Sequence, residues 1–178
     1  MPEEFRSFFS TQFGVGAVYA SESGVVKVVF PEMTKYSTAP DISSKHSSLT
    51  EYASELLCRY FGGEPIELAD IPVDLTGIPL FRHKALDVIR GVKYGEIRSY
   101  GQIAALCGSP LASRAVGGAM ASNPVPIIIP CHRIVGGDGR LTGFSASGGI
   151  NMKRLLLEME GVEFKRLLAI QKKLVINR

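Results

Sequence analysis

The side chains best suited to chemistry in this 178-residue chain are a thiol and an imidazole at adjacent positions, Cys131 and His132. A cysteine reacts as its thiolate, and a nearby imidazole or helical turn can lower the thiol pKa from about 8.5. Because adjacent side chains usually diverge, a proton would pass between the two most easily through a water molecule. Taken alone, the pair is better explained by a buried cysteine beside a surface histidine.

The remaining cysteines are not expected to react. Cys58 and Cys107 lie within and at the end of predicted helices, where a cysteine usually serves as a small buried apolar residue. Three widely spaced cysteines without a Cys-x-x-Cys pair indicate neither a disulfide framework nor a zinc site. The sequence therefore predicts no metal, and we expect no organic cofactor.

A predicted helix-turn-helix precedes the thiol. Ser99 can cap a short helix over residues 100–107, and a Gly-Ser turn follows that helix. Pro110 suits the first position of a second helix, which ends near Met120. A further helix over about 79–91 is predicted by its apolar stripe, and the whole layout is typical of a DNA-binding domain.

The second helix of this pair is poor in side chains that read base edges. Arg114 is its only charged residue, and it contains neither Asn nor Gln. The adjacent Gly117 and Gly118 cost about 1 kcal/mol each relative to alanine, which indicates that something large approaches the backbone closely. A narrow DNA minor groove would fit this surface, and another element of the protein would fit it equally well.

Charge is divided unevenly along the chain. Residues 1–76 carry a net charge of −6, and residues 77–178 carry a net charge of +9. The basic half predicts a polyanionic partner, nucleic acid above all, although a basic face that is merely solvated would give the same net charge. Because no apolar run is long enough to span a bilayer and the acidic N-terminus lacks an export signal, we expect a cytoplasmic protein.

We place a domain boundary between these two halves of the chain. In the first half, two β-rich runs around Ser-Glu-Ser-Gly predict a hairpin over residues 14–30. A helix capped by Ser48 or Thr50 is expected to follow. The sequence therefore predicts an α+β fold in two domains, residues 1–76 and residues 77–178.

The segment from Ser113 to Val135 closely resembles the signature of the 6-O-alkylguanine-DNA alkyltransferase family, and its Pro-Cys-His-Arg core is intact. The likeness runs from about Phe81 to Gly161 and includes the stretch Tyr-Gly-Glu-Ile-Arg-Ser-Tyr100. It implies a small ribonuclease-H-like N-terminal domain and a winged-helix-like C-terminal domain that contains the helix-turn-helix. The N-terminal half matches the family only in type, and it lacks the zinc-ligand cluster of some relatives.

The resemblance also implies a catalytic role for each matching residue. Cys131 is expected to accept the alkyl group, His132 to act as a base through water, and Glu160 to orient and stabilise the imidazole. Tyr100 is expected to donate a hydrogen bond to N3 of the guanine. Asn123 is expected to hold the turn between the DNA-binding helix and the active-site strand.

Further residues are implied to contact the DNA or the damaged base. Arg114 is expected to enter the base stack in place of the extruded nucleotide. Its neighbours Ser113, Ala115 and Gly118 would lie against the DNA, while Met120, Ile134, Phe144 and Ser145 would line the base pocket.

The loop over residues 141–149 departs from the commonest family pattern. It is slightly longer than in some relatives, and Phe144 stands where Tyr is frequent. A phenylalanine can pack on an alkyl group but cannot donate a hydrogen bond. Either Ser145 or Ser147 can place a backbone N–H at the guanine oxygen, and we favour Ser145.

The implied function is DNA repair by direct reversal of damage. The alkyl group of 6-O-alkylguanine, or of 4-O-alkylthymine as a second candidate, would move irreversibly to Cys131, because water does not displace a thioether under mild conditions. The damaged nucleotide must first leave the double helix, which costs a few kcal/mol. We expect a monomer that binds double-stranded DNA through the minor groove and reacts once.

Three other functions would use parts of the same sequence. A non-catalytic relative that binds alkylated DNA would not need Cys131 as a nucleophile. A sequence-specific regulator would carry base-reading side chains in the helix over residues 111–121, which lacks them. A thiol hydrolase would turn over and would need an oxyanion hole, which the sequence does not reveal.

Overall fold

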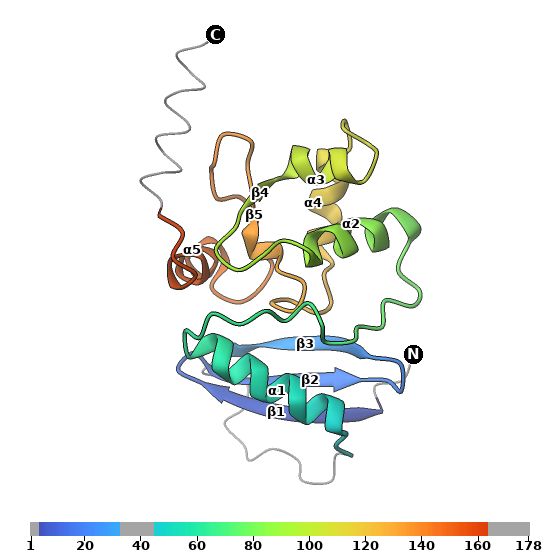
Figure 1. Ribbon diagram of the computed structural model, residues 1–178, viewed down its shortest axis with the longest axis vertical. Helices are drawn as coiled ribbons and strands as arrows, with labels where there is room; N and C mark the ends of the chain where they lie inside the picture. Colours follow the sequence, from blue (N-terminus) through green and yellow to red (C-terminus); the bar gives the residue numbers. More distant parts are fainter. Residues whose placement is uncertain (1–3, 33–44, 164–178) are drawn as a thin grey trace. The chain divides into compact units, whose positions relative to one another are not determined.

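The computed structural model describes residues 4–32 and 45–163 and shows a mixed α+β fold (Figure 1). The chain divides into two compact units. One unit lies within residues 1–78 and includes residues 124–129, and the other lies within residues 79–123 and 130–178. Among the described residues, no helix is long and apolar enough to cross a membrane.

The first unit is a three-stranded antiparallel sheet with one helix packed on it (Figure 1). Its elements are β1 (Phe5–Thr11), β2 (Gly14–Ala20), β3 (Val25–Glu32) and α1 (Ser48–Phe61), and the strands lie in the order β1-β2-β3. The predicted hairpin is confirmed as β2 and β3. The strand β1 lies outside the predicted hairpin and pairs with β2 along its whole length.

The helix α1 begins one residue earlier than its predicted cap positions allow. Its N-cap is Ser47, whose hydroxyl accepts a hydrogen bond from the Thr50 backbone N–H, while the Thr50 side chain returns to the Ser47 backbone. This reciprocal pair satisfies two of the N–H groups that every helix start leaves open. The prediction that Cys58 is buried is wrong, because its side chain is half-buried.

Within its described residues, the second unit contains four helices and a short parallel strand pair (Figure 1). Helices α2 and α3 both pack against α4. Its elements are α2 (Leu80–Arg90), β4 (Arg98–Ser99), α3 (Tyr100–Leu106), α4 (Ser113–Ala121), the 3-10 turn η1 (Cys131–Arg133), β5 (Ile134–Val135) and α5 (Gly149–Met159). The predicted helix over about 79–91 is confirmed as α2, and Cys107 is buried as expected.

The helix pair α3 and α4 departs from the prediction at one point. Ser99 caps α3 as predicted, with the Gln102 side chain completing a capping box. However, Pro110 does not open α4. The backbone N–H of Ala112 donates to the Ser109 carbonyl at 2.9 Å, so that Pro110 occupies the second position of a tight turn, where its fixed φ is favourable.

The segment that joins α4 to Cys131 is a turn, and not the active-site strand that the family resemblance implies. The backbone N–H of Ile129 donates to the Val125 carbonyl at 3.0 Å, and Ile127 has a φ of 75°, which a non-glycine residue rarely adopts. Prolines at 124, 126 and 130 explain the outcome, since proline has no N–H to donate to a sheet ladder. Within the first unit, the Pro124 carbonyl accepts a hydrogen bond from the Val28 backbone N–H.

Candidate active site

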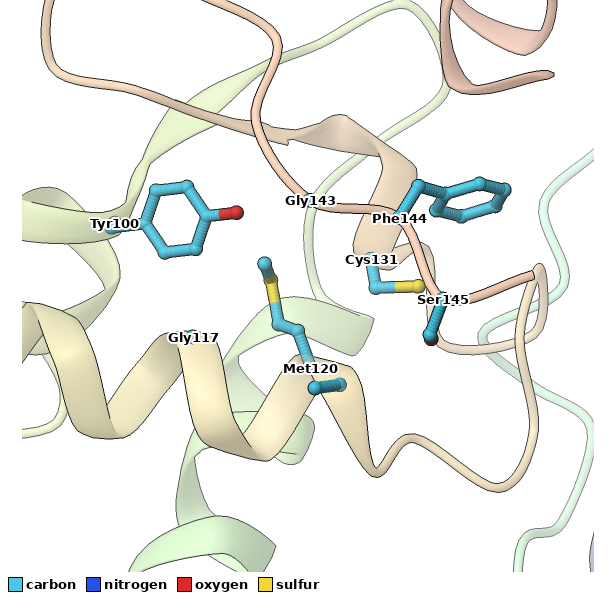
Figure 2. A pocket seen from close by; sticks show the side chains of 8 residues that line it. Tyr100, Gly117, Met120, Cys131, Gly143, Phe144 and Ser145 are labelled. Atoms are coloured by element: carbon cyan, nitrogen blue, oxygen red, sulfur yellow. The ribbon is translucent and has the colours of Figure 1, made fainter. Parts of the chain in front are cut away.

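A cavity of about 280 Å³ opens beside Cys131 in the second unit (Figure 2). Helices α3 and α4 supply one side of it, and the start of η1 and the loop after β5 supply the other. Its lining residues are Tyr100, Gly117, Met120, Ala121, Cys131, Gly143, Phe144 and Ser145. The volume is close to the lower end of the range of about 300–1,000 Å³ found for small-molecule sites, and the lining is mostly apolar.

Cys131 sits at the first position of η1 and is only 5% exposed. Burial raises the pKa of its thiol, while a hydrogen bond with the Asn123 side chain and the positive charge of Lys153 act in the opposite direction. Burial is the largest of these effects, so the resting sulfur is a neutral thiol. Reaction of this thiol therefore requires a base to remove its proton.

The imidazole of His132 is fully buried, so the interpretation of a surface histidine is wrong. Its Nε2 lies 2.8 Å from Oε1 of Glu160, a carboxylate that is also fully buried. Burial lowers the pKa of His132 and outweighs the opposing influence of Glu160. For Glu160, burial raises the pKa, but the hydrogen bond with His132 and the hydrogen bonds and positive charge of Arg133 outweigh it and bring the pKa to about 2.

The pKa shifts of His132 and Glu160 determine which nitrogen of the imidazole carries the hydrogen. A neutral imidazole carries one N–H, and the ionised carboxylate of Glu160 can only accept. The hydrogen therefore lies on Nε2 of His132, and Nδ1 is left as the basic nitrogen. A carboxylate that fixes an imidazole in this way equips it to take a proton from a nearby nucleophile.

Arg133 completes a buried ionic cluster with Glu160. Its Nε and Nη2 lie 3.0–3.2 Å from the two carboxylate oxygens, and its Nη1 donates to the Val92 carbonyl at 2.6 Å. The guanidinium matches the two carboxylate oxygens with parallel donors, which a lysine could not do. Arg133 thus keeps Glu160 ionised inside the protein and links it to Val92, just after the end of α2.

Two groups connect the loop after β5 to the rest of the cavity wall. The Thr142 hydroxyl donates to the Tyr100 hydroxyl oxygen at 3.2 Å, and the Tyr100 hydroxyl reaches the Thr142 carbonyl at 3.4 Å. The buried Lys153 ammonium donates to the carbonyls of Ile134 at 2.6 Å and Thr142 at 2.9 Å. Burial lowers the pKa of Lys153 to about 8, an effect that negative charge on the Cys131 sulfur would partly oppose.

The exposed face of α4 has one long side chain among small ones. Arg114 and Ala115 are exposed and Ser113 is partly exposed. Gly118 is also exposed, and a side-chain Cβ placed there would meet nothing within 4 Å. The helix therefore presents a shallow surface on which a large partner can approach the backbone.

The predicted base-pocket residues divide into two groups. Met120, Phe144 and Ser145 line the cavity, and Figure 2 shows Met120 and the Tyr100 hydroxyl directed toward the space that the Cys131 side chain also borders. Ile134 is fully buried in β5, where it pairs with Arg98, and is not part of the cavity lining. Among the described residues, no group of three or more His, Cys, Asp or Glu side chains could hold a metal ion.

Comparison with known proteins identifies the family. Residues 80–162 match the family model of the 6-O-methylguanine DNA methyltransferase, DNA binding domain. A methylated-DNA–protein-cysteine methyltransferase of Methanosarcina acetivorans is 35% identical over 157 residues, which cover 88% of this chain and 98% of the relative. The chain belongs to this methyltransferase family.

Two mycobacterial members of the methyltransferase family extend the comparison. The protein of Mycobacterium bovis is 48% identical over 108 residues, or 61% of this chain, and the match spans 63% of that relative's own length, less than two thirds. A crystal structure of Mycobacterium tuberculosis OGT in complex with DNA superposes with a TM-score of 0.72 at 35% identity, covering 88% of this chain and 93% of that one.

Three residues that the structure of this family member brings to the site carry no role predicted from the sequence. These residues are Arg133, which belongs to the Pro-Cys-His-Arg core, Lys153 and Thr142. A signal was present for two of them. Arg133 is a lone charge in the apolar run over residues 125–135, and Lys153 falls on the buried side of α5 beside Leu156 and Leu157. Buried charges of this kind are almost always paired.

Proposed function

We propose that this protein repairs DNA by moving the alkyl group of 6-O-alkylguanine irreversibly onto the sulfur of Cys131. The observation that carries the proposal is the position of Cys131, a buried thiol in the wall of an apolar cavity, followed directly by a histidine that a buried carboxylate orients. The family of the chain supports the same reaction. 4-O-Alkylthymine is a second proposed substrate.

The reaction begins with a proton transfer. Nδ1 of His132, the basic nitrogen, takes the thiol proton of Cys131 through a bridging water, and Glu160 stabilises the resulting imidazolium. The thiolate attacks the alkyl carbon, so that a carbon–sulfur bond forms as the carbon–oxygen bond to the base breaks. The electron pair of that bond stays with the guanine. The Tyr100 hydroxyl donates to N3 of the departing base and offsets its negative charge.

The product explains why each protein molecule reacts once. A thioether carries no leaving group that water displaces under mild conditions, so Cys131 is not regenerated. The sequence of events needs one thiol, one base and one hydrogen-bond donor, all supplied by the second unit. The protein is therefore consumed as a stoichiometric reagent.

We propose that α4 meets the DNA in the minor groove. The exposed glycine and alanine positions of this helix allow a close approach, and few of its side chains could read base edges. Arg114 would enter the stack where the damaged nucleotide has turned outward, while Ser113, Ala115 and Gly118 lie against the backbone of the DNA. Asn123 would hold the end of α4 in place relative to the thiol, and the protein would act as a monomer.

Finer features of the fold belong to the same proposal. We infer a small ribonuclease-H-like domain within residues 1–76 and a winged-helix-like domain within residues 77–178. The three-stranded sheet with α1 supports the first assignment, and the helix pair α3 and α4 next to the β4 and β5 ladder supports the second. These assignments predict that the basic half of the chain carries the DNA-binding surface.

Intact-mass analysis tests the proposed function directly. Mixing the protein with a duplex that contains one 6-O-methylguanine should add the mass of one methyl group, on the peptide that contains Cys131. Cys131→Ala should bind the same duplex without gaining mass, whereas the matched control Cys58→Ser should react normally, since Cys58 lies in the first unit. Repeated turnover would indicate a thiol hydrolase, and binding without any transfer would indicate a non-catalytic DNA-binding relative.

A further inference from the structure

The buried ammonium of Lys153 connects two segments that form the active-site cavity. Its three N–H donors face the carbonyls of Ile134 at 2.6 Å, Thr142 at 2.9 Å and Gly143 at 3.5 Å. Ile134 lies three positions after Cys131, and Gly143 is part of the cavity wall. Charge-assisted hydrogen bonds to a buried cation are strong, so these segments are held at a fixed separation.

The Thr142 carbonyl is shared between this ammonium and Tyr100. The same oxygen that accepts from Lys153 lies 3.4 Å from the Tyr100 hydroxyl. In addition, the Thr142 side-chain hydroxyl donates to the Tyr100 oxygen at 3.2 Å. Thr142 therefore meets the phenol with both an acceptor and a donor.

A hydrogen bond accepted by a hydroxyl oxygen strengthens the bond that the same hydroxyl donates, because each bond polarises the next. The phenol has a single hydrogen, which can turn from the Thr142 carbonyl to a base in the cavity. The Thr142 hydroxyl need not move during that exchange. It would hold the phenol oxygen in place and strengthen the new bond.

We propose that Thr142, itself fixed by Lys153, is a positioning residue that aims and strengthens the Tyr100 hydroxyl for alkyl transfer. The inference rests on the proposed function, because it assigns Tyr100 the role of donor to the leaving base. Thr142 acts only through Tyr100 and does not line the cavity.

Thr142 suits a direct test because its side chain is exposed. Exchanging an exposed side chain for one of similar shape usually has little effect on folding. Thr142→Val removes the hydroxyl and keeps the branched shape, and Thr142→Ser keeps the hydroxyl. Both variants can be made in the full-length protein, alone and together with Tyr100→Phe.

The measurement is the rate constant for transfer of the benzyl group from free 6-O-benzylguanine, followed by intact mass. Thr142→Val should slow transfer about threefold to tenfold, which corresponds to loss of one ordinary hydrogen bond. Thr142→Ser should recover most of that loss. In the Tyr100→Phe background, Thr142→Val should cause no further slowing, since its contribution passes through the phenol hydroxyl.

Two outcomes would overturn the inference. Equal slowing by Thr142→Val in the presence and absence of the Tyr100 hydroxyl would indicate a general effect on the loop. An unchanged rate for Thr142→Val would show that its hydroxyl contributes nothing. Both outcomes leave the proposed function standing, which fails only if the unaltered protein gains no alkyl group on Cys131.

Discussion

Nε2 of His132 and Oε1 of Glu160 lie 2.8 Å apart, and both side chains are fully shielded from solvent. The pair joins η1 to the end of α5, across 28 positions of sequence. Since Arg133 binds the same carboxylate, the base of the proposed reaction and the ionic cluster of the fold share one residue. A change at Glu160 should therefore affect stability and reactivity together.

Acid should destabilise the fold in two overlapping stages. The pKa of His132 is lowered in the fold, so below about pH 6.5 the unfolded chain binds a proton that the folded chain resists, and stability falls. The pKa of Glu160 is lowered to about 2 in the fold. Its ionised carboxylate therefore contributes fully to the free energy of unfolding above the usual pKa of 4.5, and this contribution is lost as the pH falls toward 2. Urea unfolding measured from pH 3 to 7 should show both stages.

The control for the acid prediction is Glu160→Gln, which cannot ionise. Its free energy of unfolding should be lower than that of the unaltered protein at neutral pH. It should also change less between pH 4.5 and 3, because the carboxylate that titrates there is gone. Parallel curves for the two proteins in this range would show that Glu160 does not carry the effect.

Removing Arg133 should strongly destabilise the second unit. Arg133→Met would leave the Glu160 carboxylate buried without its bidentate partner, and breaking a buried ion pair from one side typically costs about 3–5 kcal/mol. Arg133→Lys should lose less, since the charge remains. Denaturant unfolding checks both variants, and a loss below 1 kcal/mol for Arg133→Met would contradict a structural role for the cluster.

The Cys131 thiol should titrate at a higher pH than an ordinary cysteine, because burial raises its pKa. Thiolate absorbance in the ultraviolet can follow the titration in a Cys58→Ser, Cys107→Ser background. Cys131 should also react more slowly with iodoacetamide than free cysteine does at pH 7.5. Titration below the ordinary thiol pKa would mean that the resting sulfur is already ionised and needs no base.

Arg114→Ala should weaken repair of DNA more than reaction with a free base. On duplex DNA containing 6-O-methylguanine, the variant should capture the extruded nucleotide less well and transfer more slowly. Free 6-O-benzylguanine needs no extrusion, so its rate should change little. Arg140→Ala is the matched control, because Arg140 is exposed in the same unit but pairs with Asp138 outside α4. Equal losses on both substrates would assign Arg114 to folding.

Local signals in the sequence were sufficient where one residue decides the structure. Ser99 begins α3 as its capping chemistry predicts, and the Ser-Glu-Ser-Gly turn divides β2 from β3. Pro110 has two favourable positions, at the start of a helix and inside a turn, and propensity alone does not choose between them. In the structure the turn is formed, and the Ala112 backbone N–H donates to the Ser109 carbonyl.

The long-range arrangement of the site could not be predicted from residue patterns. The apolar run around His132 does not reveal the partner of its imidazole, since Glu160 arrives with α5. The same is true of Thr142 and Tyr100, which meet only after the intervening chain has folded. The resemblance to a family named Glu160, but the contacts that Lys153 and Thr142 make had to come from the structure.

The turn between α4 and Cys131 has a consequence for dissecting the protein into fragments. Residues 124–129 pack with the first unit, while the residues on both sides of them belong to the second. The side chains of Val125 and Ile127 to Ile129 are buried in the folded chain, so a fragment that begins at Pro79 would carry this apolar segment without the unit with which it packs. Expression of the second half alone should therefore favour aggregation more than expression of the full chain does.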